Sequence, residues 1–277
     1  MEEIPPHLPV LLEESISQLL TDLNGIYLDS TIGFGGHAFA IMEKLTPAGK
    51  LIGLDLDPYA LEYCQKRLSG IQGSYSLYNK NFREFPSLLQ KLGINKLTGI
   101  LFDLGSSSSQ INTGHRGFSF QSDASLDMRF NPEAGISAKQ YLNTTDADEI
   151  GETIYKYGEE RNYRKIAHSI CEAAKRGKMN TTFELKQAVE SIVNPRFLNK
   201  SLARVFQAVR IKINDELEAI KQALTESSKW LKSGGRIAVI SFHSLEDRIV
   251  KRFFRHNARS CVCPREYPVC VCDTIPT

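Results

Sequence analysis

The chain has 277 residues, of which 42% are hydrophobic and 24% are charged, and its formal net charge is +2. This length and composition are ordinary for a globular protein with one large domain, with or without an insertion. No apolar run approaches the roughly 20 residues that span a bilayer, which excludes a helical membrane segment. The acidic, proline-containing start is unlike a secretory signal, and the six cysteines do not form a disulfide framework, so we expect a cytoplasmic protein.

The stretch from Gly25 to Asp55 predicts the opening unit of a nucleotide-binding α/β domain. A short apolar run ends in Asp29, glycines follow at positions 33, 35 and 36, a helical pattern comes next, and a second apolar run ends in Asp55. Glycines let backbone N–H groups approach a ligand closely, and the helix N-terminus behind them favours an anionic group. Asp55, at the end of the second strand, is placed to accept hydrogen bonds from two ribose hydroxyls.

The glycine pattern by itself fits more than one cofactor. Gly33, Gly35 and Ala38 match G-x-G-x-x-A, which an NAD(P)-dependent oxidoreductase would also show. Against that alternative, the chain lacks an evident second mononucleotide-binding half and a catalytic Tyr-x-x-x-Lys signature. A tight turn without any ligand is the other alternative, and an acid arriving about 20 residues later argues against it.

Strands and helices continue to alternate as far as Asp103. The patterns predict a helix from Pro58 to about Leu68, a strand at residues 75–78, a helix at about 85–92 and a short buried strand that ends in Asp103. An amphipathic helix precedes the first strand. Because ligands bind at the carboxyl ends of the strands in such sheets, we expect Asp103 to belong to the site.

From residue 106 to residue 200 the alternation stops and the pattern becomes helical. We therefore expect a core formed by residues 1–105 and 201–277, with an inserted, mainly helical substrate-recognition domain at 106–200. Between Lys156 and Lys212 there are 13 Lys/Arg against 5 Asp/Glu, which is typical of an RNA-facing surface or of a solvated helix face. The basic residues that we consider for RNA contact are Arg161, Arg164, Lys165, Arg204 and Arg210.

The core is predicted to resume with one long helix from about Ser201 to Trp230. Arg236 to Phe242 then reads as the next strand, and His243 follows it at the same edge of the sheet as Asp103.

Most of these stretches resemble the MraW-type methyltransferases, which use S-adenosylmethionine to methylate the N4 amine of a cytosine in small-subunit (16S) ribosomal RNA. The matching segments, in chain order, are H-x-P-V-L-L-x-E from His7, D-S-T-I-G-F-G-G-H from Asp29, D-L-G-S-S-S-S-Q from Asp103, R-G-F-S-F from Arg116, L-D-M-R-F from Leu126, Y-G-E-E-R from Tyr157, F-Q-A-V-R-I from Phe206 and S-F-H-S-L-E-D-R-I-V-K-R-F from Ser241. They cover most of the chain, so the resemblance is specific.

The resemblance implies a class I methyltransferase fold, a Rossmann-like doubly wound sheet, with a helical domain inserted after the fourth strand. It implies S-adenosylmethionine as the cofactor and 16S ribosomal RNA within the small ribosomal subunit as the partner. A homodimer is a further expectation, and no membrane partner is expected. The cofactor positions that carry over from the family are Gly35, Gly36, His37, Asp55, Phe82, Asp103 and Gln110.

Methylation of an exocyclic amine sets its own chemical demands. The amine donates its lone pair into the pyrimidine ring, so an enzyme must hold it in line with the methyl group and accept hydrogen bonds from its N–H groups. Asp103 is the candidate for this role, or for contact with the methionine amino group, or for both in succession. His243 is the candidate proton acceptor, and a histidine that only hydrogen-bonds the helix start is the alternative.

The last stretch of the chain holds the pairs Cys261/Cys263 and Cys270/Cys272. Four thiolates can bind one tetrahedral zinc, but the usual spacing has two to four residues between paired cysteines rather than one. We therefore expect no metal site, and a structural zinc in this tail is the alternative.

Overall fold

The computed structural model describes residues 9–105 and 116–259, together with residues 261, 263, 267, 269 and 272. The chain divides into two compact units. The sheet unit consists of Leu8–Gly105 and Leu217–Thr277, and the helical unit consists of Met1–His7 and Ser106–Glu216. Among the helices in the described ranges, none is long and apolar enough to cross a membrane.

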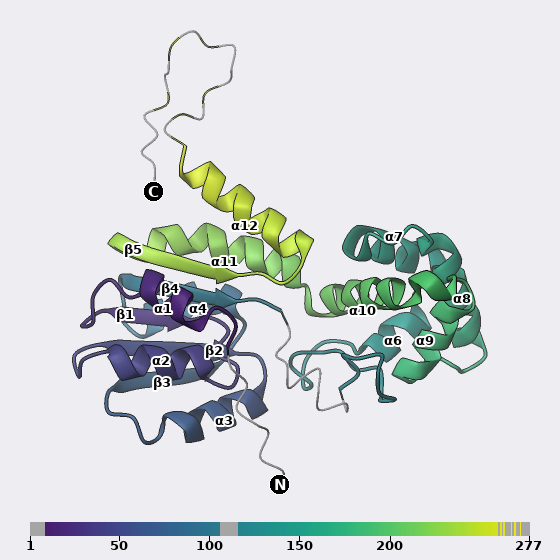
Figure 1. Cartoon of the computed structure of the whole chain (residues 1–277), viewed down its shortest axis with the longest axis horizontal. Helices are drawn as coiled ribbons and strands as arrows, with labels where there is room; N and C mark the ends of the chain where they lie inside the picture. Colours follow the sequence, from purple (N-terminus) through teal and green to yellow (C-terminus); the bar gives the residue numbers. More distant parts are fainter. Residues whose placement is uncertain are drawn as a thin grey trace. The chain divides into compact units, whose positions relative to one another are not determined.

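The sheet unit is built on parallel strands whose order along the sheet is β3-β2-β1-β4-β5. The strands are β1 (Ile26–Asp29), β2 (Lys50–Asp55), β3 (Ser74–Asn79), β4 (Leu97–Asp103) and β5 (Leu231–Ile240). The chain winds outward from β1 to β3 and then restarts beside β1 with β4, so the strand order reverses between these two strands (Figure 1). This is the predicted doubly wound α/β fold of class I methyltransferases, and the reversal is where such sheets bind ligands.

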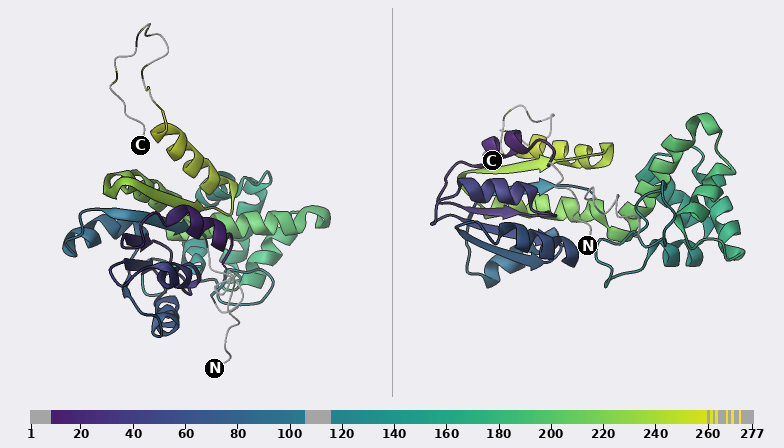
Figure 2. Two further views of the ribbon diagram at one scale, coloured as in Figure 1. Left: turned by 60° about the vertical axis from the view of Figure 1, so that its left-hand side comes forward. Right: turned by 60° about the horizontal axis from the view of Figure 1, so that its bottom comes forward.

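Helices cover both faces of this sheet (Figures 1 and 2). They are α1 (Leu12–Leu19), α2 (Gly36–Lys44), α3 (Pro58–Leu68), α4 (Phe85–Lys91), α11 (Glu216–Trp230) and α12 (Ser244–Asn257), with a 3₁₀ turn η1 (Phe82–Glu84). Successive residues of one strand point to opposite faces, so Tyr27 joins the apolar cluster under α1 to α3 and Leu28 joins the cluster under α4, α11 and α12. Burial on both faces explains why the central strands are continuously apolar.

The helical unit has an apolar core of its own. Its elements are α6 (Ala138–Thr144), α7 (Ala147–Gly158), α8 (Tyr163–Lys175), α9 (Thr182–Glu190), a 3₁₀ turn η2 (Pro195–Phe197) and α10 (Leu198–Asn214). Leu202, Val205, Phe206 and Val209 recur at helical spacing along α10 and are all buried in this core. The apolar face of α10 therefore holds the helix in this unit, which extends to Glu216, beyond the boundary predicted at residue 200.

The predicted long helix from Ser201 to Trp230 is wrong, because the chain breaks it at Asp215. Asp215 adopts a left-handed conformation with φ of 50°, so α10 ends before it and α11 begins after it. Contacts distant in the sequence hold the break. The side-chain amide of Asn214 donates to the carbonyl of Met128 at 2.7 Å and accepts the N–H of Phe130 at 2.7 Å. Helical periodicity carries no signal for such contacts.

Candidate active site

Three carboxylates lie at the carboxyl ends of the central strands. Asp29 ends β1, Asp55 ends β2 and Asp103 ends β4. In a parallel sheet these ends meet at one edge, and here they flank the point where the strand order reverses. Burial raises the pKa of Asp29, and the like charges of Asp103 and Asp55 add to this rise, as expected for carboxylates that share one edge.

The glycine-rich turn after β1 leads directly into α2. Gly33 and Gly35 have φ angles of +50° and +74°, a left-handed conformation that glycine adopts without a steric penalty. A Cβ at Gly35 would lie 2.7 Å from the sulfur of Cys64, so the turn also needs the missing side chain for space. Gly35 is the N-cap of α2 and no described side chain caps this helix, so its first N–H groups are donors for an anionic group.

Asp55 is fixed by two backbone amides. Its Oδ2 accepts the N–H of Gly33 at 2.9 Å and its Oδ1 accepts the N–H of Asp57 at 2.8 Å. Burial raises the pKa of Asp55 to about 6, and these hydrogen bonds oppose that rise. At neutral pH the group is thus a carboxylate held in one orientation, with lone pairs left to accept further hydrogen bonds.

Asp103 and His37 form the second part of the site. The Asp103 N–H donates to Oγ1 of Thr31 at 2.6 Å, and its Oδ2 lies 3.6 Å from Nδ1 of His37. Burial lowers the pKa of His37. Burial also raises the pKa of Asp103, to about 6, and the negative charge of Glu246 adds to this rise. The structure thus brings together two residues that lie more than sixty positions apart in the sequence.

Two buried polar atoms of this pair have no partner in the described ranges. They are Oδ1 of Asp103 and Nε2 of His37. A buried polar atom without a hydrogen bond costs about 1–3 kcal/mol, and in a native structure it points to a ligand or an ordered water. The pair therefore fits a ligand that donates to a carboxylate and hydrogen-bonds an imidazole.

Phe82 begins η1, directly after the cap residue Asn81. Its half-buried ring packs edge-to-face on Phe102 of β4, with centroids 5.9 Å apart and an interplanar angle of 89°. The ring thus belongs in part to the core, and its remaining surface is free to pack on a ligand. Gln110, the last predicted cofactor residue, lies outside the described residues.

His243 is the N-cap of α12. Its Nδ1 accepts the N–H of Glu246 at 3.4 Å, and the Glu246 carboxylate accepts the N–H of Phe242 at 2.8 Å and that of His243 at 3.3 Å. Nε2 of His243 lies 3.2 Å from Oε1 of Glu246, within ion-pair distance if the imidazole is protonated but not aligned as a hydrogen bond. The hydrogen bond at Nδ1 is the contact expected of the alternative role of His243, in which the histidine only hydrogen-bonds the helix start.

Sequence reasoning missed three residues that shape this site. The sequence pattern identifies Asp29 only as the end of a strand, yet burial raises its pKa to about 8. Thr31 anchors the Asp103 backbone, and the completely buried Glu246 acts electrostatically on Asp103. Asp29 and Thr31 lie inside the glycine-loop motif, which is the only signal in the sequence that could have found them.

The basic side chains considered for RNA contact divide into two groups. Arg161, Arg164 and Lys165, at the start of α8, are exposed. Arg210 forms a bidentate pair with Glu216 at 2.9 and 3.0 Å, and Arg204 lies 3.5 Å from the buried Glu160. Arg210 thus serves the fold of the helical unit, and Arg204 is shared between an internal carboxylate and solvent.

A sequence profile of the MraW methylase family matches residues 5–277. The chain belongs to the MraW methylase family. Three relatives named ribosomal RNA small subunit methyltransferase H illustrate the match. The protein of Caldicellulosiruptor saccharolyticus is 45% identical, over 96% of this chain and 87% of its own length. That of Dehalococcoides mccartyi is 44% identical over 98% and 77%, and that of Fusobacterium nucleatum is 40% identical over 97% and 86%.

Membership of the MraW methylase family confirms the resemblance found in the sequence. It makes the chain a methyltransferase that uses S-adenosylmethionine, and it leaves the NAD(P)-dependent alternative without support. Among solved structures, an rRNA methylase from Streptococcus thermophilus has a TM-score of 0.29 and 20% identity, over 38% of this chain and 58% of that chain. A TM-score this low supports no conclusion.

Proposed function

We propose that this chain transfers a methyl group from S-adenosylmethionine to the N4 amine of a cytosine in 16S ribosomal RNA, within the small ribosomal subunit. Its MraW family membership and its relatives' names support the class of reaction and of substrate. The observation that carries the chemistry is the buried Oδ1 of Asp103, an acceptor without a partner in the described ranges, beside a glycine turn. Such an acceptor is what an exocyclic amine needs.

The residues at the sheet edge fit the cofactor. Asp55 would accept hydrogen bonds from the ribose hydroxyls, and the first N–H groups of α2, after Gly35 and Gly36, would hold the carboxylate of the methionine part. Phe82 would pack on the adenine, and His37 would hydrogen-bond the methionine part through Nε2. When bound, S-adenosylmethionine supplies a methyl group activated by its sulfonium.

Asp103 is proposed as the residue that activates the amine. With its pKa near 6 it is mostly a carboxylate at neutral pH, so Oδ1 can accept an N–H of the amine and free the lone pair. The same raised pKa makes it a better proton acceptor than an ordinary carboxylate. Contact with the methionine amino group before the amine arrives is compatible with this role.

His243 is proposed mainly as a positioning residue. Because its Nδ1 accepts the Glu246 N–H, the neutral imidazole carries its proton on Nε2. To take a second proton, Nδ1 would have to give up the cap. Direct proton acceptance by His243 is the alternative, and a substitution that keeps the cap separates the two roles.

The helical unit is proposed to recognise the RNA, with Arg161, Arg164 and Lys165 as phosphate contacts. All three are exposed around the start of α8, within the basic part of the sequence. A cytoplasmic location, where ribosomal subunits are found, and a homodimer belong to the same proposal, and light scattering of the purified chain tests the dimer.

The decisive experiment maps the methyl group. The purified chain is incubated with unmethylated small ribosomal subunits and methyl-labelled S-adenosylmethionine, and the labelled nucleoside is identified by mass spectrometry. We expect the label on N4 of one cytosine, and none with Asp103→Ala at saturating cofactor. Label on a ring carbon or on a ribose would overturn the proposed reaction, and full single-turnover activity of Asp103→Ala would remove Asp103 from it.

A further inference from the structure

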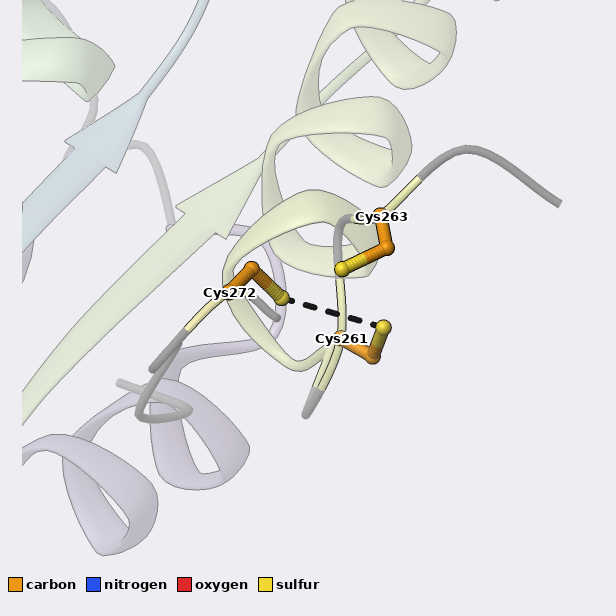
Figure 3. A group of neighbouring side chains, drawn as sticks. All are labelled: Cys261, Cys263 and Cys272. Carbon is orange, nitrogen blue, oxygen red and sulfur yellow. Dashed lines mark hydrogen bonds between the residues drawn. The ribbon is translucent and has the colours of Figure 1, made fainter. Parts of the chain in front are cut away.

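The cysteines of the C-terminal tail form a cluster that the methyltransferase site does not use. The sulfur atoms of Cys261, Cys263 and Cys272 all lie within 4.8 Å of one another. Figure 3 shows that the three side chains point into the same space, with Cys261 and Cys263 on the segment after α12 and Cys272 on a second segment. We propose that these thiols bind a structural Zn²⁺ ion.

The spacing of the sulfur atoms fits metal ligation. The Sγ atoms of Cys261 and Cys272 are 3.7 Å apart. A zinc–thiolate bond is about 2.3 Å long, so two thiolates on one tetrahedral ion lie about 3.8 Å apart. The two sulfurs of a disulfide are separated by only about 2.0 Å. The observed separation therefore corresponds to one edge of a tetrahedral zinc site.

The sequence supplies the donor chemistry that such a site needs. Thiolates are soft ligands and select zinc over hard cations such as magnesium and calcium. The single residue between Cys261 and Cys263 is compatible with ligation, because the sulfur atoms of these two cysteines lie within 4.8 Å of each other. The sequence holds a fourth thiol in this tail, Cys270, which lies outside the described residues.

The two described apolar side chains of the tail are exposed. Tyr267 is 56% exposed and Val269 is 70% exposed, so its described apolar side chains are not buried in a core. A segment that cannot bury apolar surface gains order from a metal crosslink instead.

Metal analysis of the full-length chain tests the proposal. The protein is purified under reducing conditions without chelator or polyhistidine tag, and its zinc is measured by mass spectrometry. We expect about one zinc per chain. After replacement by Co²⁺, we expect the thiolate-to-cobalt absorption of a tetrahedral site. Cys261→Ser and Cys272→Ser should each weaken zinc binding at least about 100-fold, since even changes outside the ligand shell cost up to that much.

The control is Cys171→Ser, which removes a half-buried cysteine of the helical unit and should leave the zinc content unchanged. A measurement without variants guards against misfolding, because stepwise blocking of the wild-type thiols should release zinc in proportion to the tail cysteines modified. A wild-type chain that binds neither Zn²⁺ nor Co²⁺ would overturn the proposal. So would a zinc affinity of Cys261→Ser equal to that of the wild type, or an intact-mass loss showing that Cys261 and Cys272 form a disulfide.

Discussion

Asp29→Asn should stabilise the folded chain, and the gain should grow as the pH rises. Asp29 is only 1% exposed, and its side chain accepts the N–H of Thr31 at 3.2 Å. Burial raises its pKa from 3.8 to about 8, with a smaller contribution from the charges of Asp103 and Asp55. Asparagine keeps the shape and the acceptor for the Thr31 amide but has no charge to desolvate.

The sign and size of this stability difference follow from the linkage between protonation and folding. Between pH 4 and pH 8 the unfolded chain has lost the Asp29 proton and the folded chain retains it, so wild-type stability falls as the pH rises through this window. One pH unit is worth about 1.4 kcal/mol, so the penalty at pH 7, relative to an ordinary pKa of 3.8, is at most about 4 kcal/mol. Above the folded pKa of about 8 the difference between variant and wild type should level off.

Urea denaturation of both proteins in one buffer series from about pH 5 to about pH 8 measures this difference. The matched control is Asp148→Asn, at an exposed position in the first turn of α7. The difference in unfolding free energy between this variant and the wild type should not change with pH. A free-energy difference for Asp29→Asn that is constant with pH, or that shrinks as the pH rises, would refute the reasoning.

Three further predictions concern the cofactor, the cap and the RNA. Asp55→Ala removes the carboxylate that is proposed to accept two charge-assisted hydrogen bonds from the ribose hydroxyls. It should weaken S-adenosylmethionine binding at least about tenfold by calorimetry, and an unchanged Kd would contradict this role. His243→Ala should cost about 1 kcal/mol of stability through loss of the cap, whereas His243→Asn should keep both the cap and the single-turnover rate. If His243→Asn keeps its thermal stability but slows methylation by about 10²–10⁴-fold, His243 is the proton acceptor. Arg161→Glu/Arg164→Glu should weaken binding to ribosomal subunits and lower the salt dependence of that binding without changing cofactor affinity. The control Lys229→Glu, at an exposed position of α11, should change neither the binding to ribosomal subunits nor its salt dependence. A fall in cofactor affinity alone would make these arginines structural.

The sequence was sufficient for the parts of the protein that depend on local patterns. Apolar runs that end in Asp29, Asp55 and Asp103 alternate with helical segments, and in a parallel sheet the carboxyl ends of such runs meet at one edge. The positions of Gly33 and Gly35 identified the turn, because their left-handed conformations are disfavoured for other residues. The fold class and the edge that carries the carboxylates could therefore be predicted before any coordinate was known.

The tertiary structure decided whatever depends on residues distant in the sequence. Only packing shows that Asn214 holds a break in the predicted long helix. Burial is the main cause of the raised pKa of Asp29, and the sequence does not show it, because desolvation depends on what surrounds a carboxyl group in space and not on its neighbours along the chain. The structure alone also shows His243 engaged as a cap and brings the sulfurs of Cys261 and Cys272 to 3.7 Å. A sequence pattern specifies which groups are available, and three-dimensional packing specifies which of them meet and in what dielectric environment.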